Sequence, residues 1–527
     1  MATPSLAMIP SAYADSKVYS VLPNNGDGDF TFNRDSSATR VGQNGLIQEV
    51  GYFGSEEVTN GDFATDSDWN KGAGWTISGG TANCDGTANN AISQNFSLPT
   101  GTLRIKFDIT ARTQGSVNLW INKPAFTQLL SVDAVGSYEV DVVTTSGANN
   151  IYFYSASNFS GSIDNVSVQA VLGDQPRLNY DISNGVVQSC PSLLLEPAST
   201  NLLPYSEDFS QYSQTNITVA DNNSTSPEGI VNSSKLTDDS TNGNHRIFLS
   251  HTTTAASHTF SIFMKKGTMT TAFLRFLSGS DIAGANVDLD AGTISATAGT
   301  AKIEAYPNDW YKCSITGTAV SGTSYVYVYM KQLAGYSGTS QDMFVFGAQV
   351  EALSYATSYI PTDGSSQTRA AETCNDAGTA STFNSTEGVL YAEISALAND
   401  LTNRRITISD GTNTNRVVTG YNTTSNQIFY FVVVGGSTVA SGNYTSSDIT
   451  ELSKIAIKFK ANDFALWVDG VERHTDTSGA IFSANTLSSL QFEQGSGGAL
   501  FFYGNTKDIR VYNEALTDAQ LQTLTTL

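Results

Sequence analysis

The residues best suited to chemistry in this sequence are aromatic side chains on stretches that alternate in polarity. The stretch "SYVYVYMK" carries a tyrosine at every second position, and a β-strand would point all of them to one face: Tyr325, Tyr327 and Tyr329. Aromatic rings stack on the C–H faces of sugar rings while polar neighbours satisfy the hydroxyls. We predict that the opposite face, Val326, Val328 and Met330, packs in the core. The tyrosine face then either forms a glycan groove or covers an outer sheet or a subunit contact.

Two tryptophans are further candidates for stacking on a sugar. Trp69 lies in the polar stretch "DSDWNKG", and Trp120 ends the strand-like stretch "SVNLW". Either ring is expected to project from a rim or a sheet face, where a ligand can reach it. Trp75, Trp310 and Trp467 lie among the core residues of their segments and are predicted to pack there.

Catalytic groups are sparse, and we expect no enzyme. The chain has four histidines, and its serines form no G-x-S-x-G turn. Glycoside cleavage needs two carboxylates across a bond, one of them in an apolar pocket, whereas most acids here lie in Ser, Gly and Asn turns. A dispersed pair brought together by the fold stays open, because strands join distant residues.

No metal or other cofactor is expected. The stretch "NNGDGDF" places Asp27 and Asp29 as in a calcium loop, but it lacks the closing glutamate and is interpreted as a turn. The four cysteines are far apart and form no CxxC pair, which predicts isolated thiols. Calcium elsewhere in the chain stays open, with no ligands assigned.

Charge and hydropathy exclude several partners. Lys and Arg total 27 against 49 for Asp and Glu, a formal charge of −22, so nucleic acid and anionic membranes should be repelled. The longest apolar run, Ile428 to Val434, is too short to span a bilayer. No basic segment precedes Lys17, so we expect no signal peptide, no membrane insertion and release by lysis.

The elements that position these residues are antiparallel strands. Period-two alternation recurs after the first fifty residues, as in "RIKFDIT" and "KIAIKFK", and 527 residues suffice for about three domains. The last stretch changes period after Tyr512: Thr517 and Gln520 can form a capping box, and Leu516 and Leu521 a hydrophobic staple. We predict an all-β chain of several antiparallel β-sandwich (jelly-roll) domains in a row, ending in a short helix that covers an open end of the sheets.

Three segments resemble known sandwich families. Residues 55–171 resemble a carbohydrate-binding module of the jelly-roll type, and residues 207–372 are a looser version with the same Asp-Phe opening. Residues 373–527 resemble the laminin-G-like or concanavalin-like lectin sandwich, through "EGVLYAEI", "FALWVDGVERH" and the closing "GNTKDIRVYNEALTDAQLQTL". These resemblances imply β-sandwiches of a glycan-binding type.

The stretches between these segments resemble virion structural proteins of tailed bacteriophages, often described as tail-fibre-like. They include "RDSSATRVGQNGLIQEV", "PRLNYDISNGVVQSCPSLLLEPASTNLL" and "ATSYIPTDGSSQTRAAETC". In that family the first stretch is followed closely by the second, but here about 115 residues separate them. Residues 55–171 are therefore interpreted as an insertion into an attachment arm made of residues 1–54 and 172–206.

The resemblance implies a non-enzymatic virion protein, a fibre or an appendage of head or tail. The arm (1–54 and 172–206) would contact other virion proteins, the sandwiches would bind host-surface glycan, and the chain would form a homo-oligomer, a trimer by family resemblance. Two alternatives stay open. One is a decoration or joining protein of the head or tail with no ligand, and the other is a bacterial surface lectin or polysaccharide-processing accessory protein.

Overall fold

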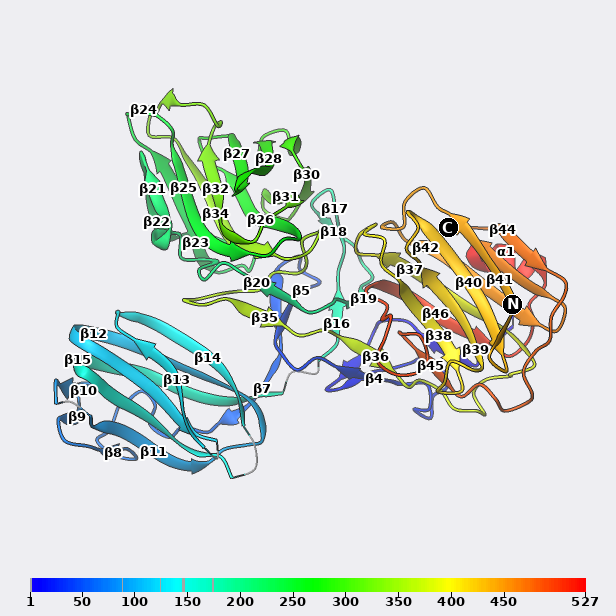
Figure 1. The fold of residues 1–527 in the computed structure, drawn as a ribbon, viewed down its shortest axis with the longest axis horizontal. Helices are drawn as coiled ribbons and strands as arrows, with labels where there is room; N and C mark the ends of the chain where they lie inside the picture. The colour runs from blue at the N-terminus through cyan, green and yellow to red at the C-terminus, as the bar shows by residue number, and fades with distance from the viewer. Residues whose placement is uncertain (1, 88, 124, 145–146, 173–174) are drawn as a thin grey trace.

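The chain is almost entirely β-structure. The computed structural model describes residues 2–87, 89–123, 125–144, 147–172 and 175–527. These ranges hold 46 strands, the 3-10 helix η1 (Phe209–Gln211) and the helix α1 (Asp518–Thr525), and the strands pair antiparallel (Figure 1). The prediction of an all-β chain of sandwiches with one short C-terminal helix is confirmed. Neither helix in these ranges has the length and apolar character needed to cross a bilayer.

The first sandwich is one nine-stranded sheet folded onto itself. Two long strands, β12 and β15, run side by side, and five register shifts along their pairing let them bend between the two layers. Alternate residues such as Leu119 and Phe153 fill its core. The nine strands are β7 (Tyr52–Glu56), β8 (Asn70–Lys71), β9 (Trp75–Ser78), β10 (Thr81–Asp85), β11 (Ala91–Ser97), β12 (Gly101–Asn122), β13 (Phe126–Val132), β14 (Gly136–Thr144) and β15 (Asn149–Leu172).

This sandwich is connected to the rest of the chain by two neighbouring strands. Phe53 on β7 is the register partner of Val171 on β15, so the chain enters and leaves the sandwich at the same place. The flanking stretches also meet, because the Val41 amide donates to Asn179 Oδ1 at 2.8 Å and its carbonyl accepts from the Tyr180 amide. A connection of this kind suits a domain inserted into a loop.

The second sandwich packs two six-stranded sheets around one apolar core. The first sheet has the order β21 (Ser213–Thr215), β25 (Arg246–Thr253), β32 (Gly322–Met330), β27 (Thr271–Ser278), β28 (Ser280–Asp288), β29 (Thr293–Ala298). The second has the order β22 (Ile217–Thr225), β23 (Val231–Asp238), β34 (Asp342–Glu351), β26 (Ser257–Lys266), β31 (Trp310–Thr318), β30 (Thr300–Ala305). The short pair β24 (Asn242–Gly243) and β33 (Tyr336–Ser337) extends one end.

The third sandwich is closed by strands from distant parts of the chain. Its larger sheet contains β16 (Arg177–Asn179), β19 (Ser192–Leu195), β46 (Gly504–Tyr512), β37 (Glu387–Ala396), β42 (Ser453–Lys460), β43 (Phe464–Val468) and β44 (Val471–Asp476), with β1 (Leu6–Met8) also paired to β46. The facing sheet has the order β41 (Ser437–Thr445), β40 (Gln427–Val434), β39 (Arg416–Tyr421), β38 (Arg404–Ser409), β45 (Ser489–Gln491). Leu6, Phe30 and Leu193 are buried in the core between them.

The segments 1–54 and 172–206 therefore do not form a unit apart from the sandwiches. Besides β1, β16 and β19, they supply short pairs that lie among the three lobes (Figure 1). These strands are β2 (Tyr13–Ala14), β3 (Lys17–Val18), β4 (Phe30–Asn33), β5 (Ala38–Val41), β6 (Ile47–Val50), β17 (Ile182–Ser183), β18 (Val186–Val187) and β20 (Ser199–Asn201). Two strands from later in the chain pair with them, β35 (Gln367–Arg369) with β20 and β36 (Thr373–Asn375) with β4.

The C-terminal helix follows its sequence signals, but it covers a different surface from the one expected. The Thr517 hydroxyl caps the Gln520 amide, and the Gln520 side chain bonds back to Thr517, as predicted. Leu516, Leu521 and Leu524 are buried against Tyr391 and Trp467 and their neighbours on the outer face of the larger sheet. The helix covers that face rather than an open end, because small residues of β42 and β43 leave room there for the leucines.

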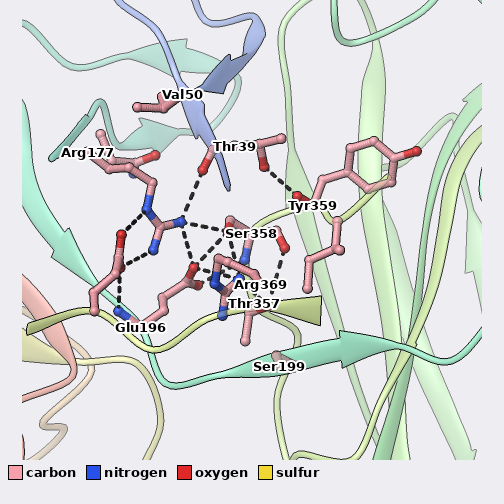
Figure 2. Close-up of polar contacts among 12 residues, drawn as sticks. Thr39, Val50, Arg177, Glu196, Ser199, Thr357, Ser358, Tyr359 and Arg369 are labelled. Carbon is pink, nitrogen blue, oxygen red and sulfur yellow. Dashed lines mark hydrogen bonds and ion pairs between the residues drawn. The ribbon is translucent and has the colours of Figure 1, made fainter. Parts of the chain in front are cut away.

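A fully buried ionic cluster lies where the three lobes meet. We call Arg34, Arg177, Arg369, Glu196 and Glu372 the junction. Arg177 lies at its centre and contacts both carboxylates of the cluster. Its Nη1 is 2.7 Å from Glu196 Oε2 (Figure 2), and its Nε is 2.8 Å from Glu372 Oε1. Arg34 pairs with Glu372 at 2.7 Å, and Arg369 with Glu196 at 3.0 Å.

Backbone and hydroxyl groups accept hydrogen bonds from further donors of the junction, while Arg369 Nε is buried without a partner among the described residues. Arg34 donates to the Ser36 and Val50 carbonyls, and Arg369 Nη2 to the Pro197 carbonyl at 2.7 Å. Thr357 links Arg369 to a third carboxylate, that of Glu351 on β34, so three arginines meet three glutamates. Burial alone would raise the pKa of Glu196. Arg369 and Arg177 instead hold this pKa below its ordinary value, so the Glu196 carboxylate stays ionised.

Candidate functional site

An aromatic platform lies on the outer face of the first sandwich. We call Trp120, Phe126, Tyr152 and Tyr154 the Trp120 platform. Leu119 and Ile121 point into the core, so Trp120 between them points outward, and its register partner across β15 is Tyr152. The Trp120 and Phe126 rings stack with centroids 4.8 Å apart and planes inclined by 14°, and Phe126 is 48% exposed.

Side-chain amides border the Trp120 platform. Asn118 lies across from Tyr154 and donates weakly to Gln128, while its own Oδ1 is buried without a hydrogen-bond partner. Asn122 donates to Asn149 at 3.0 Å, and Asn150 donates to the Tyr152 hydroxyl at 3.1 Å. Flat apolar rings beside amide donors and acceptors are the groups that bind a neutral sugar.

The expectation that Trp69 projects toward a ligand is wrong. Trp69 is 6% exposed and packs between Phe63 and Phe153 in the core of the first sandwich. Its Nε1 donates to the Asn60 carbonyl at 3.0 Å. Left-handed backbone at Asn60, Phe63 and Asp68 turns this polar stretch back over the sheet, so the ring is buried although its neighbours in sequence are polar.

The two faces of the tyrosine strand are as predicted, but the tyrosine face is covered. Val326, Val328 and Met330 are buried in the core of the second sandwich, and the tyrosines lie on the opposite face. Tyr327 is 8% exposed and Tyr329 only 1%.

Two arginines provide this cover. The Arg246 and Arg275 guanidinium carbons lie 5.2 and 5.3 Å from the Tyr327 ring centroid. Arg246 also donates to the Tyr329 hydroxyl at 2.8 Å, and Arg275 is held by Asp281. The arginines occupy ring faces of Tyr327 and Tyr329 that a sugar would need, so these two tyrosines belong to a closed outer layer.

The third sandwich has an open groove that the sequence patterns did not single out. On the outer face of its five-stranded sheet, Phe429 and Phe431 stack with centroids 5.7 Å apart, and Arg405 lies over both rings. The groove beside them has a volume of about 450 Å³. The alternation in "QIFYFVVV", the same signal as in the tyrosine strand, would have indicated this pair of phenylalanines.

Residues 390–522 match the concanavalin A-like lectin/glucanases superfamily. The match covers about a quarter of the chain and lies within the third sandwich, which we now call the lectin-like sandwich. It includes Arg405, Phe429 and Phe431 and supports the family resemblance expected for residues 373–527.

Comparisons with solved structures give only distant likenesses. A Ruminococcus gnavus IT-sialidase CBM40 bound to α2,3-sialyllactose is 14% identical, covers 27% of this chain and 83% of its own, and has a TM-score of 0.23. Domain 4 of AbnA, a GH43 arabinanase from Geobacillus stearothermophilus, in complex with arabinotriose, is 10% identical over 30% and 73%, with a TM-score of 0.24. A Trypanosoma rangeli sialidase in complex with sialic acid is 9% identical over 94% and 97%, with a TM-score of 0.21. No curated protein sequence matches this chain, and TM-scores of this size carry no argument about function.

A cavity of about 740 Å³ between the first and second sandwiches gathers carboxylates. Burial raises the pKa of Glu228 to about 7 and also raises that of Glu207. The Asn232 amide donates to both carboxylates at 2.9 Å, and the Tyr359 hydroxyl donates to Glu207 at 2.8 Å. Raised pKa values suit a general acid, but these two groups are bound to side chains of the protein itself.

The described residues show no cluster that could hold a metal through three or more His, Cys, Asp or Glu side chains. At the stretch interpreted as a turn, Asn25 donates to Asp27 at 2.8 Å, and Asp29 accepts from the Ser20 amide at 3.0 Å. These contacts are the turn chemistry expected there. The four cysteines are free thiols: Cys190 is exposed, and Cys84, Cys313 and Cys374 are buried.

Proposed function

We propose that this chain is a non-catalytic glycan-binding protein whose first sandwich holds sugar on the Trp120 platform. The observation that carries the proposal is the pair of stacked rings, Trp120 and Phe126, one of them widely exposed, bordered by the side-chain amides of Asn118 and Asn122. The lectin-superfamily match of residues 390–522 supports a glycan-binding role for the chain as a whole. Each site should be weak, and display of many copies on one particle would amplify it.

We further propose that the particle is a tailed-phage virion, on which the chain serves as a fibre or as an appendage of head or tail. The support is the sequence resemblance of the stretches that form the junction. Arg34, Arg177 and Arg369 in these stretches are fully buried, so attachment to other virion proteins needs other residues of 1–54 and 172–206. Ile9, Tyr19 and Val21 are exposed apolar side chains near the N-terminal strands and suit that contact. A trimer is the oligomer that the resemblance implies.

The proposed function predicts that the full chain is retained by immobilised glycans and that Trp120→Ala loses at least about tenfold in affinity, because the stacking surface is removed. Tyr19→Ala, an exposed aromatic residue outside the Trp120 platform, is the matched control and should bind as the unchanged chain does. A glycan array measures retention, and titration calorimetry measures affinity.

If no glycan is retained, the purely structural role of a virion decoration or joining protein replaces this proposal. Retention with full affinity by Trp120→Ala would move the site elsewhere in the chain. A reconstruction of the particle with the chain located in it would test the virion assignment separately.

A further inference from the structure

The groove of the lectin-like sandwich is lined by Arg405, and a second arginine, Arg416, lies on the same sheet face. Across the strands, Arg405 is the register partner of Gly420, which in turn pairs with Phe429. Gly420 has no side chain, so the Arg405 guanidinium reaches over it and lies 5.9 and 5.3 Å from the Phe429 and Phe431 ring centroids. Arg416 lies on β39 four residues before Gly420, and its guanidinium carbon is 5.2 Å from the Phe431 ring centroid.

Neither arginine has a carboxylate partner among the residues that the structure describes. Arg416 donates to the Gln494 carbonyl at 2.8 Å and to the Asn413 side chain, and Arg405 makes only its aromatic contacts. The Nε atoms of both are buried with no hydrogen-bond partner. Burial, and for Arg405 also the nearby charge of Arg416, lower the pKa of each guanidinium.

With a formal charge of −22 the chain has many carboxylates, and some ring-stacked arginines are paired with one: Arg275 over Tyr327 bonds Asp281 at 2.6 Å. A guanidinium stacks through its flat face, which leaves the N–H groups along its edge free to bind a carboxylate or sulfate in a bidentate way. Arg405 lines the groove and brings a positive charge to it, and its guanidinium makes no hydrogen bond to the described residues.

The rest of the groove suits hydroxyl groups. It is lined by Asn403, Asn422, Ser441, Asn443 and His474, which offer amide, hydroxyl and imidazole groups, and no lysine or acid lines it. Its volume of about 450 Å³ lies within the range of small-ligand pockets. One anionic group flanked by several hydroxyls is the composition of an acidic sugar.

We propose that this groove binds an acidic saccharide, with the carboxylate or sulfate of one sugar held by the edge of Arg405 and its hydroxyls held by the asparagine and serine side chains. Arg416 adds to the positive field at the site. The inference shares the class of ligand with the proposed function, but it uses a different domain and a different chemistry from the Trp120 platform.

The test measures binding of the full chain to three soluble probes: polygalacturonate, which carries carboxylates, dextran sulfate, and neutral dextran. We expect binding to a charged probe that weakens as salt is raised, and a loss of at least about tenfold in Arg405→Gln. Arg405→Lys keeps the charge without the planar edge and should lose part of the affinity. Arg275→Gln removes an arginine that is stacked but paired with a carboxylate, and it should bind as the unchanged chain does.

Several outcomes would overturn the inference. One is the absence of binding to both charged probes, and another is equal affinity in Arg405→Gln. A third is equal affinity for inorganic sulfate alone, which would identify a general anion site. If Arg405→Gln fails to fold, competition on the unchanged chain decides: the charged probe should be displaced by galacturonate oligosaccharides and not by neutral ones. Trp120→Ala should leave this binding intact, so the two proposals can fail separately.

Discussion

Arginine serves opposite purposes in two regions of this molecule. In the junction, Arg177 is fully buried and bonds two carboxylates, a backbone carbonyl and a hydroxyl. In the groove of the lectin-like sandwich, Arg405 lies half-buried on two phenylalanine rings, and none of its described neighbours is a carboxylate. The Arg177 guanidinium is hydrogen-bonded by groups of the protein itself, whereas the Arg405 guanidinium keeps donors for a ligand.

The difference teaches how to separate structural from ligand-binding charges. Burying an ion costs free energy, and the fold recovers that cost only when partners are supplied, as in the junction. A charged residue that has no ion-pair partner contributes little to the free energy of unfolding. Stability and binding measurements should therefore respond to the two arginines in opposite ways.

The largest effect should come from removing the centre of the junction. Arg177→Met leaves Glu196 and Glu372 buried with too few partners, so we expect the free energy of unfolding to fall by about 3–5 kcal/mol. Denaturant unfolding followed by tryptophan fluorescence measures it. Arg275→Met, which breaks a partly exposed pair, is the control and should cost less than about 1 kcal/mol. A loss below that value for Arg177→Met would mean that the junction contributes little to stability.

A smaller effect of opposite sign is expected at Glu228, a carboxylate that forms no ion pair with the described residues. Its pKa in the folded chain is raised from 4.5 to about 7 by burial and by Glu207. The folded state therefore binds the proton more tightly than the unfolded state does, and its stability should fall as pH rises through this window. Glu228→Gln should stabilise the chain by about 1–3 kcal/mol at pH 8 and by much less at pH 4.

Thermal melts across this pH range check the Glu228 prediction, with the exposed Glu451→Gln as control. Equal stabilisation at both pH values would contradict it.

At Glu372 the sign is reversed. Burial would raise its pKa, but Arg177 and Arg34 hold the pKa low, so the stability that Glu372 contributes is present at neutral pH and lost as pH falls below 4.5.

The smallest effect on stability should come from Arg405→Gln. Because Arg405 has no carboxylate partner in the described part of the chain, we expect the melting temperature to stay nearly constant, with a free-energy change within about 0.5 kcal/mol, while binding to an acidic saccharide is lost. A destabilisation comparable to that of Arg177→Met would mean that Arg405 has a structural role, as Arg177 has, and the two regions would no longer differ.

The sequence predicted features that depend on local periodicity. Alternation assigned Val328 to the core and Tyr327 to the other face, and the spacing of Thr517 and Gln520 predicted the helix start. It could not predict that Arg246 and Arg275 close the tyrosine face, because those residues lie on other strands.

Contacts between distant positions were beyond such reasoning. Trp120 meets Phe126 across a register shift, and Arg34 meets Glu372 across 338 positions of sequence. The resemblance of the stretches around these arginines suggested an attachment arm, whereas their buried side chains bind one another. Trp69 was wrongly predicted to lie at a rim. The polar residues beside it in sequence do not show that a turn brings its ring back into the core.

The pairing of β1 with β46 sets an order of events for a newly made chain. Leu6 and Val511 are register partners, so strands from the two ends of the described chain lie side by side in the lectin-like sandwich. During synthesis the first two sandwiches can close while this one waits, with its N-terminal strand unpaired, until the ribosome has passed residue 512. Contacts that far apart in sequence form slowly. The exposed edge left in that interval is the stage at which this protein is most open to aggregation and to capture by a chaperone.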